Sequence, residues 1–80
     1  MSRWPLGRLR VMSGREACAI LAQHGFAEVR RRSSHIVMQR RDALGTITIP
    51  VPDHGELKIG TLRSIIRQSG IPRAAFETSS

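Results

Sequence analysis

The clearest strand pattern in the sequence ends in two prolines, and this combination limits the sheet that the chain can form. Over residues 46–51, isoleucine and valine alternate with threonine, so one face of the expected strand is apolar and the other is polar. Pro50 and Pro52 have no amide hydrogen to donate to a neighbouring strand. The strand must therefore end at these prolines or lie at an edge of its sheet.

Two further strand segments precede this one, and short turns connect them. Residues 27–32 are mostly charged and form the weaker segment. In residues 35–40, Ile36 and Met38 alternate with His35, Val37 and Gln39. Ser33-Ser34 and residues 42–45 are short enough to be hairpin turns. We therefore expect the three strands to pair in an antiparallel arrangement.

Helical patterns flank the strands. Ser13 and Glu16 have the spacing of a capping box, and the apolar side chains that follow predict a helix over residues 14–24. Residues 57–69 return to helical spacing, and Gly70 is suited to end that helix. The order α-β-β-β-α predicts an α+β fold, in which two helices pack on one face of a three-stranded antiparallel sheet.

The length and the single cysteine narrow the class of protein. A chain of 80 residues is long enough for one small core, so we assign residues 12–80 to a single domain. Residues 1–11 are basic and lack periodicity, and we expect them to form a flexible leader. The longest apolar run, residues 17–22, is much shorter than a membrane-spanning helix. Cys18 has no cysteine partner, which makes the reducing cytoplasm the expected location and an inert thiol the expected state.

Positive charge is the strongest indication of a partner. Lysine and arginine number 13 against six acidic residues, giving a formal net charge of +7, which favours a polyanion and nucleic acid first. No metal-site spacing and no glycine-rich phosphate loop occurs, so we expect neither a metal nor a cofactor. Five arginines flank one histidine, His35, within a single predicted hairpin: Arg30, Arg31, Arg32, Arg40 and Arg41.

A two-residue turn before His35 would determine which side chains share each face of the sheet. Alternation then pairs Val29 with Met38 and directs both toward the helices. The opposite, open face would carry His35, Arg30, Arg32, Gln39 and Arg41.

A histidine among arginines on an open sheet face is suited to RNA cleavage. Arginines hold phosphates through charge-assisted hydrogen bonds, and a neutral imidazole beside a held phosphodiester can accept the proton of a ribose 2′-OH. The oxyanion then attacks the adjacent phosphorus without a metal, and DNA, which lacks the 2′-OH, would survive. His35 is thus the candidate acid/base, and the candidate phosphate ligands are Arg30, Arg32, Arg41, Lys58 and Arg63. The same pattern also fits a surface histidine in a solvated basic strand, so charge alone leaves catalysis open.

A series of short segments, in a specific order, resembles a known family. The segments are SGRE at residues 13–16, QHGF at 23–26, RSSHIV at 32–37, ITIPVP at 47–52, HGELK at 54–58 and GTLRSIIRQSG at 60–70. Together they make residues 13–76 similar to the HicA toxins of bacterial HicA–HicB toxin–antitoxin pairs. The resemblance implies a fold like that of the double-stranded-RNA-binding domain.

The resemblance also implies an activity and a partner. HicA proteins are mRNA interferases that cut RNA through the histidine of a Gly-Ser-His segment, a position that His35 occupies here, with Ser33 in place of the glycine. A HicB antitoxin would block this site, and the toxin would be connected to DNA only indirectly, through that antitoxin. We expect a metal-independent endoribonuclease toxin that cleaves mRNA. The alternatives are a non-catalytic double-stranded-RNA-binding module and an interaction subunit whose basic face meets an acidic protein.

Overall fold

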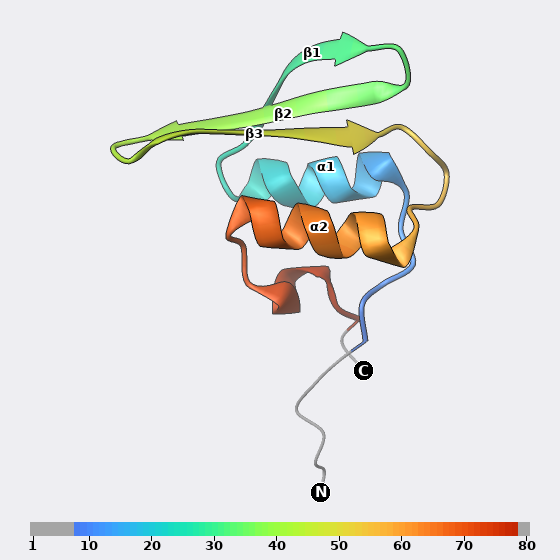
Figure 1. Cartoon of the computed structure of the whole chain (residues 1–80). Helices are drawn as coiled ribbons and strands as arrows, with labels where there is room; N and C mark the ends of the chain where they lie inside the picture. The colour runs from blue at the N-terminus through green and yellow to red at the C-terminus, as the bar shows by residue number, and fades with distance from the viewer. Residues whose placement is uncertain (1–7, 79–80) are drawn as a thin grey trace, which may run out of the picture.

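The structure, a computed structural model, describes residues 8–78 and has the order of elements that the sequence predicts. Two helices pack on one face of a three-stranded antiparallel sheet, which confirms the α+β fold (Figure 1). No helix within residues 8–78 is long and apolar enough to cross a membrane. The elements are α1 (Gly14–Gln23), β1 (Ala27–Arg32), β2 (His35–Asp42), β3 (Gly45–Pro52), α2 (Ile59–Ser69) and a short 3-10 helix, η1 (Arg73–Phe76).

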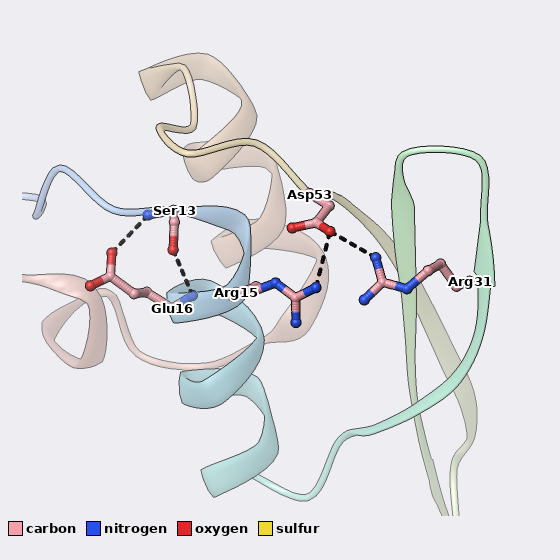
Figure 2. Close-up of polar contacts among 5 residues, drawn as sticks. All are labelled: Ser13, Arg15, Glu16, Arg31 and Asp53. Atoms are coloured by element: carbon pink, nitrogen blue, oxygen red, sulfur yellow. Dashed lines mark hydrogen bonds and ion pairs between the residues drawn. The ribbon is translucent and has the colours of Figure 1, made fainter.

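A capping box begins α1 as predicted. The Ser13 hydroxyl accepts a 3.0 Å hydrogen bond from the Glu16 amide, and the Glu16 carboxylate accepts a 2.8 Å bond from the Ser13 amide (Figure 2). Gly14 follows in close contact with the chain after β3, where its amide donates to the His54 carbonyl at 2.9 Å. A Cβ at Gly14 would overlap the Pro52 carbonyl oxygen, so the start of α1 and the end of β3 are packed backbone to backbone.

The sheet has the order β1-β2-β3, with β2 in the centre. Because β3 lies at an edge of the sheet, it has no second neighbouring strand that would need hydrogen bonds from its two prolines. Both β2 and β3 run longer than the predicted segments, and their hairpin closes where Asp42 pairs with Gly45. This hairpin extends past the ends of the helices (Figure 1).

The pairing of β1 with β2 differs from the prediction at one residue. Arg30 pairs with Val37, but Met38 pairs with Glu28 instead of Val29, because the register shifts between Glu28 and Arg30. Val29 is the extra residue of this β-bulge, and its side chain is 45% exposed instead of facing the helices. The prediction that Val29 pairs with Met38 and joins the core was therefore wrong.

The core lies between the helices and the sheet. The predicted stripe of α2 is buried at Leu62, Ile65 and Ser69, and Gly70 ends the helix in the left-handed conformation at φ +71. The sheet contributes the side chains of β2 and β3 that alternate toward the helices. These are Ile36, Met38, Ile49 and Val51, all of them at most 3% exposed.

Part of the segment predicted to be a flexible leader belongs to the folded domain. The Arg10 amide donates to the Phe76 carbonyl at 2.9 Å, and the Thr78 amide donates to the Arg8 carbonyl at 2.8 Å. Leu9 lies between these bonds, pairs with Glu77 and packs against the core. The boundary expected at residue 12 is therefore corrected for residues 8–11, while residues 1–7 lie outside the described part of the chain.

Candidate functional site

The face of the sheet opposite the helices brings the central candidates together. Residues that are directly opposite in antiparallel strands share a face, and Arg32 is opposite His35. In the next row, Arg30 is opposite Val37, which in turn is opposite Pro50. An open depression of about 360 Å³ on this open face is lined by Arg30, Arg32, His35, Val37, Thr48 and Pro50.

His35 is positioned by the turn that precedes it. It is the first residue of β2, directly after Ser33-Ser34, and its side chain is exposed. Ser33 has φ +51, a left-handed conformation that glycine adopts more easily than serine. The Asp53 amide donates a 2.7 Å hydrogen bond to the Ser34 carbonyl, which ties the loop after β3 to this turn. The backbone at His35 is thus held by β1, by β3 and by the loop that follows β3.

Asp53 also binds the middle one of the three consecutive arginines of β1, on the face of the sheet opposite the other two. Arg31 points to the side opposite Arg30 and Arg32, where its guanidinium donates to the Asp53 carboxylate at 2.7 Å (Figure 2). Arg15 from α1 approaches the same carboxylate oxygen at 3.4 Å. The hydrogen bond from Arg31 is the main cause that lowers the pKa of Asp53, and the same bond raises the pKa of Arg31. Arg31, which the sequence placed beside His35, is therefore committed to an ion pair behind the open face.

A second flanking arginine is also directed away from the open face. The guanidinium of Arg40 lies 4.8 Å from the centre of the Phe26 ring and donates to the His24 carbonyl at 3.3 Å. Its Nε is buried and 3.7 Å from the Asp42 carboxylate. Arg40 therefore supports the junction between α1 and β1 and has no part in the depression.

The remaining candidates lie farther from His35. Arg41 is on the open face opposite Thr46, six residues along β2 from His35, which corresponds to about 20 Å of strand. Lys58 immediately precedes α2 and Arg63 lies on α2, the helix that packs against the other face of the sheet (Figure 1). The structure therefore groups only Arg30 and Arg32 with His35.

Sequence reasoning missed part of the depression and the clamp behind it. Val37, Thr48 and Pro50 were noted as strand residues only, although the alternation that selected His35 also places them on its face. Asp53 follows the last predicted strand, and nothing local in the sequence connects it to Arg31, 22 positions earlier.

Cys18 is not part of the site. Burial raises the pKa of its thiol from 9.0 to about 11, with Glu28 and Asp53 adding to the rise. Within residues 8–78, no three histidine, cysteine, aspartate or glutamate side chains are grouped as metal ligands would be.

Comparison with known proteins identifies the family. The family model described as the HicA toxin of bacterial toxin–antitoxin systems matches residues 14–71, from the first residue of α1 to just beyond α2. A search of curated proteins found no match. Because the match covers well over half of the sequence and includes His35 with both arginines of the depression, the chain belongs to the HicA toxin family of bacterial toxin–antitoxin systems.

Proposed function

We propose that this toxin is a metal-independent endoribonuclease that cleaves mRNA and thereby inhibits translation, with His35 as its acid/base. The observation that carries the proposal is the grouping of His35 with Arg30 and Arg32 in one open depression. The helices pack against the other face of the sheet, so an extended strand of RNA can reach these side chains. Membership in a toxin family supplies the biological setting in which RNA cleavage would arrest growth.

The chemistry needs only groups that this face provides. Arg30 and Arg32 would hold a phosphodiester by charge-assisted hydrogen bonds. The neutral imidazole of His35 would take the proton of the neighbouring 2′-OH, whose oxygen then bonds to phosphorus. The bond from phosphorus to the 5′-oxygen breaks, and a proton returned by His35 leaves a 5′-OH end and a cyclic phosphate. General acid–base help of this kind contributes about 10²–10⁴-fold, and the arginines would stabilise the charge that develops on the phosphorane.

Substitution of His35 is the direct test. We expect purified His35→Ala protein to lose at least about 100-fold in the cleavage of single-stranded RNA in EDTA, and to retain RNA binding. His24→Ala is the matched control, because His24 lies beside α1 on the helix side of the molecule, where its ring contacts the Ile20 carbonyl at 3.0 Å. DNA of the same sequence should remain intact. Unchanged cleavage by folded His35→Ala protein would falsify the assignment.

The same experiment separates the alternative function. The α-β-β-β-α order and the basic open face also suit a non-catalytic module that binds double-stranded RNA. Such a module would prefer duplex RNA and would leave single strands intact in EDTA. A cleaved single strand with 5′-OH ends would exclude it.

The proposed partner is a HicB-like antitoxin that covers the open face. Carboxylates on such a protein could occupy the positions of RNA phosphates beside Arg30 and Arg32. Binding would then block cleavage, and any contact with operator DNA would be made by the antitoxin. We expect an adjacent gene for a protein with an acidic surface, and competition between that protein and RNA for the toxin.

A further inference from the structure

The floor of the depression beside His35 differs chemically from its rim. Val37 and Pro50 are paired across β2 and β3, and neither side chain carries a polar atom. Val37 is only 5% exposed, although it lies on the face away from the helices. Because the side chains that share its depression are Arg30, Arg32, His35, Thr48 and Pro50, these neighbours cover it.

Such a floor is suited to a nucleobase. A phosphate would gain no hydrogen bond from this floor, whereas the flat face of a base would bury apolar area against the exposed ring of Pro50, beside the covered Val37. The cationic rim can hold the phosphates on either side of that base. A guanidinium of the rim can also stack on a base, as arginines do in proteins that recognise single-stranded RNA.

A polar pair lies next to this floor, in the following row of the sheet. The Gln39 carboxamide nitrogen donates a 3.0 Å hydrogen bond to the Thr48 hydroxyl, directly across β2 and β3. A carboxamide has two N–H donors and one carbonyl acceptor, so one donor and the acceptor of Gln39 remain available. The bond to Thr48 holds this donor and acceptor beside the depression, which Thr48 itself lines.

We propose that the depression is a nucleobase site of a single-stranded RNA substrate, and that Gln39, held by Thr48, selects the base. Val37 is two residues from His35 along β2, about 7 Å, so the bound base would belong to a nucleotide adjacent to the scissile phosphate. The donor and acceptor of Gln39 match a base edge that presents an acceptor beside a donor, as adenine does. This inference rests on the proposed function, because it assumes that RNA crosses the open face.

Mapping of cleavage ends tests the selection. On a random single-stranded RNA pool, the wild-type protein should prefer one base at a set position beside the cut, and Gln39→Ala should reduce that preference. A good bidentate contact discriminates between bases by roughly five- to 150-fold, which sets the size of the loss. Thr48→Val, which removes the hydroxyl but keeps the shape, should reduce the preference less. Gln68→Ala is the matched control, since Gln68 also donates to a hydroxyl, that of Ser64 at 2.8 Å, but lies on α2.

The outcomes separate this inference from the proposed function. If wild-type and Gln39→Ala proteins cleave with the same base preference, or if the wild-type protein has none, the base site is refuted and the nuclease remains. Complete loss of cleavage by folded Gln39→Ala protein would also refute it, because Gln39 would then act in the reaction. If no cleavage occurs at all, the nuclease proposal fails.

A binding measurement tests the base site without cleavage. In the His35→Ala background, short single-stranded RNAs that differ in one base should bind with unequal affinity. Adding Gln39→Ala should make those affinities converge while the salt dependence stays the same, because Gln39 is expected to hold no phosphate. Equal affinities before the Gln39 substitution, or an unchanged ranking after it, would contradict the proposal.

Discussion

The guanidinium of Arg31 donates a 2.7 Å hydrogen bond to the carboxylate of Asp53, across 22 residues of sequence. This pair lies on the side of the hairpin opposite His35, and the Asp53 amide is hydrogen-bonded to the Ser34 carbonyl in the turn that precedes His35. Two of three consecutive arginines, Arg30 and Arg32, therefore share the open face with His35, and the middle one connects the turn to the rest of the domain through Asp53. Charge in this hairpin serves both the site and the fold.

The Arg31–Asp53 pair predicts a pH-dependent coupling in stability. The hydrogen bond from Arg31 lowers the pKa of Asp53 below its ordinary value of 3.8, so the folded chain releases this proton more readily than the unfolded chain. The stabilisation is therefore present above about pH 4 and is lost as the pH falls through the lowered pKa. Urea unfolding of the wild type, Arg31→Gln, Asp53→Asn and the double variant should show coupling at pH 7 that shrinks toward pH 2. A coupling that is equal at both pH values would contradict this account.

The conformation of Ser33 predicts that glycine is better at this position. In the left-handed region, a non-glycine residue such as Ser33 destabilises the fold by about 1–2 kcal/mol relative to glycine. The greater conformational freedom of glycine in the unfolded chain offsets about 0.5–1 kcal/mol of that difference. We expect Ser33→Gly to stabilise the protein by up to about 1 kcal/mol, or about 4–8 °C in Tm. Ser34→Gly is the control, because Ser34 does not have a positive φ and should lose stability. A lower Tm for Ser33→Gly would mean that its hydroxyl is needed.

The parts of the fold that were predictable depend on residues that are close in sequence. The capping box joins Ser13 to Glu16, three positions later. Which β2 side chains lie on each face follows from alternation once the length of the turn before His35 is known. Both features are present in the structure, because each depends on residues only a few positions apart. The open face with its histidine could therefore be anticipated from pattern alone.

The features that were missed depend on contacts between distant segments. A strand with a bulge at Val29 and a regular strand can have the same amino-acid composition, so the sequence of β1 does not predict the bulge. The partners of Arg31 and Arg40 are selected by packing, which brings Asp53 and Phe26 to them. Counting charges near His35 therefore overestimated the number of arginines available to a substrate.

The close packing at Gly14 predicts opposite effects for two similar substitutions. Gly14→Ala would force its Cβ onto the Pro52 carbonyl oxygen, and relief requires movement of backbone, so we expect a loss of about 1–3 kcal/mol. Gly60 lies in the first turn of α2, where no atom of residues 8–78 outside the adjoining helix backbone and the neighbouring residues lies within 4 Å of an added Cβ. Gly60→Ala should therefore stabilise the protein by about 0.5–1 kcal/mol. Thermal unfolding of both variants measures the contrast. Equal stability of the two would refute the close approach of α1 to β3.

The raised pKa of Cys18 predicts that its thiol reacts slowly with alkylating reagents. With a pKa of about 11 in place of 9.0, mainly because of burial, the folded protein should hold about 100-fold less thiolate than the unfolded chain at pH 8. Alkylation by iodoacetamide should be correspondingly slow in buffer and fast in urea at the same pH. Equal rates in the two conditions would show that the thiol is accessible and active in the native state.

Because the arginines are divided between the two sides of the sheet, we can predict which of them control the salt dependence of RNA binding. In the His35→Ala background, Arg30→Gln and Arg32→Gln should each flatten the dependence of log affinity on log salt by about 0.7, the value for one phosphate contact with single-stranded RNA. Arg63→Gln removes the same charge from the exposed surface of α2 and serves as the matched control, so its slope should equal that of the parent. Titrations of a labelled RNA at several salt concentrations provide the slopes. If Arg63→Gln flattens the slope as much as Arg30→Gln, RNA is held by net charge around the whole domain, and the open face loses its special role.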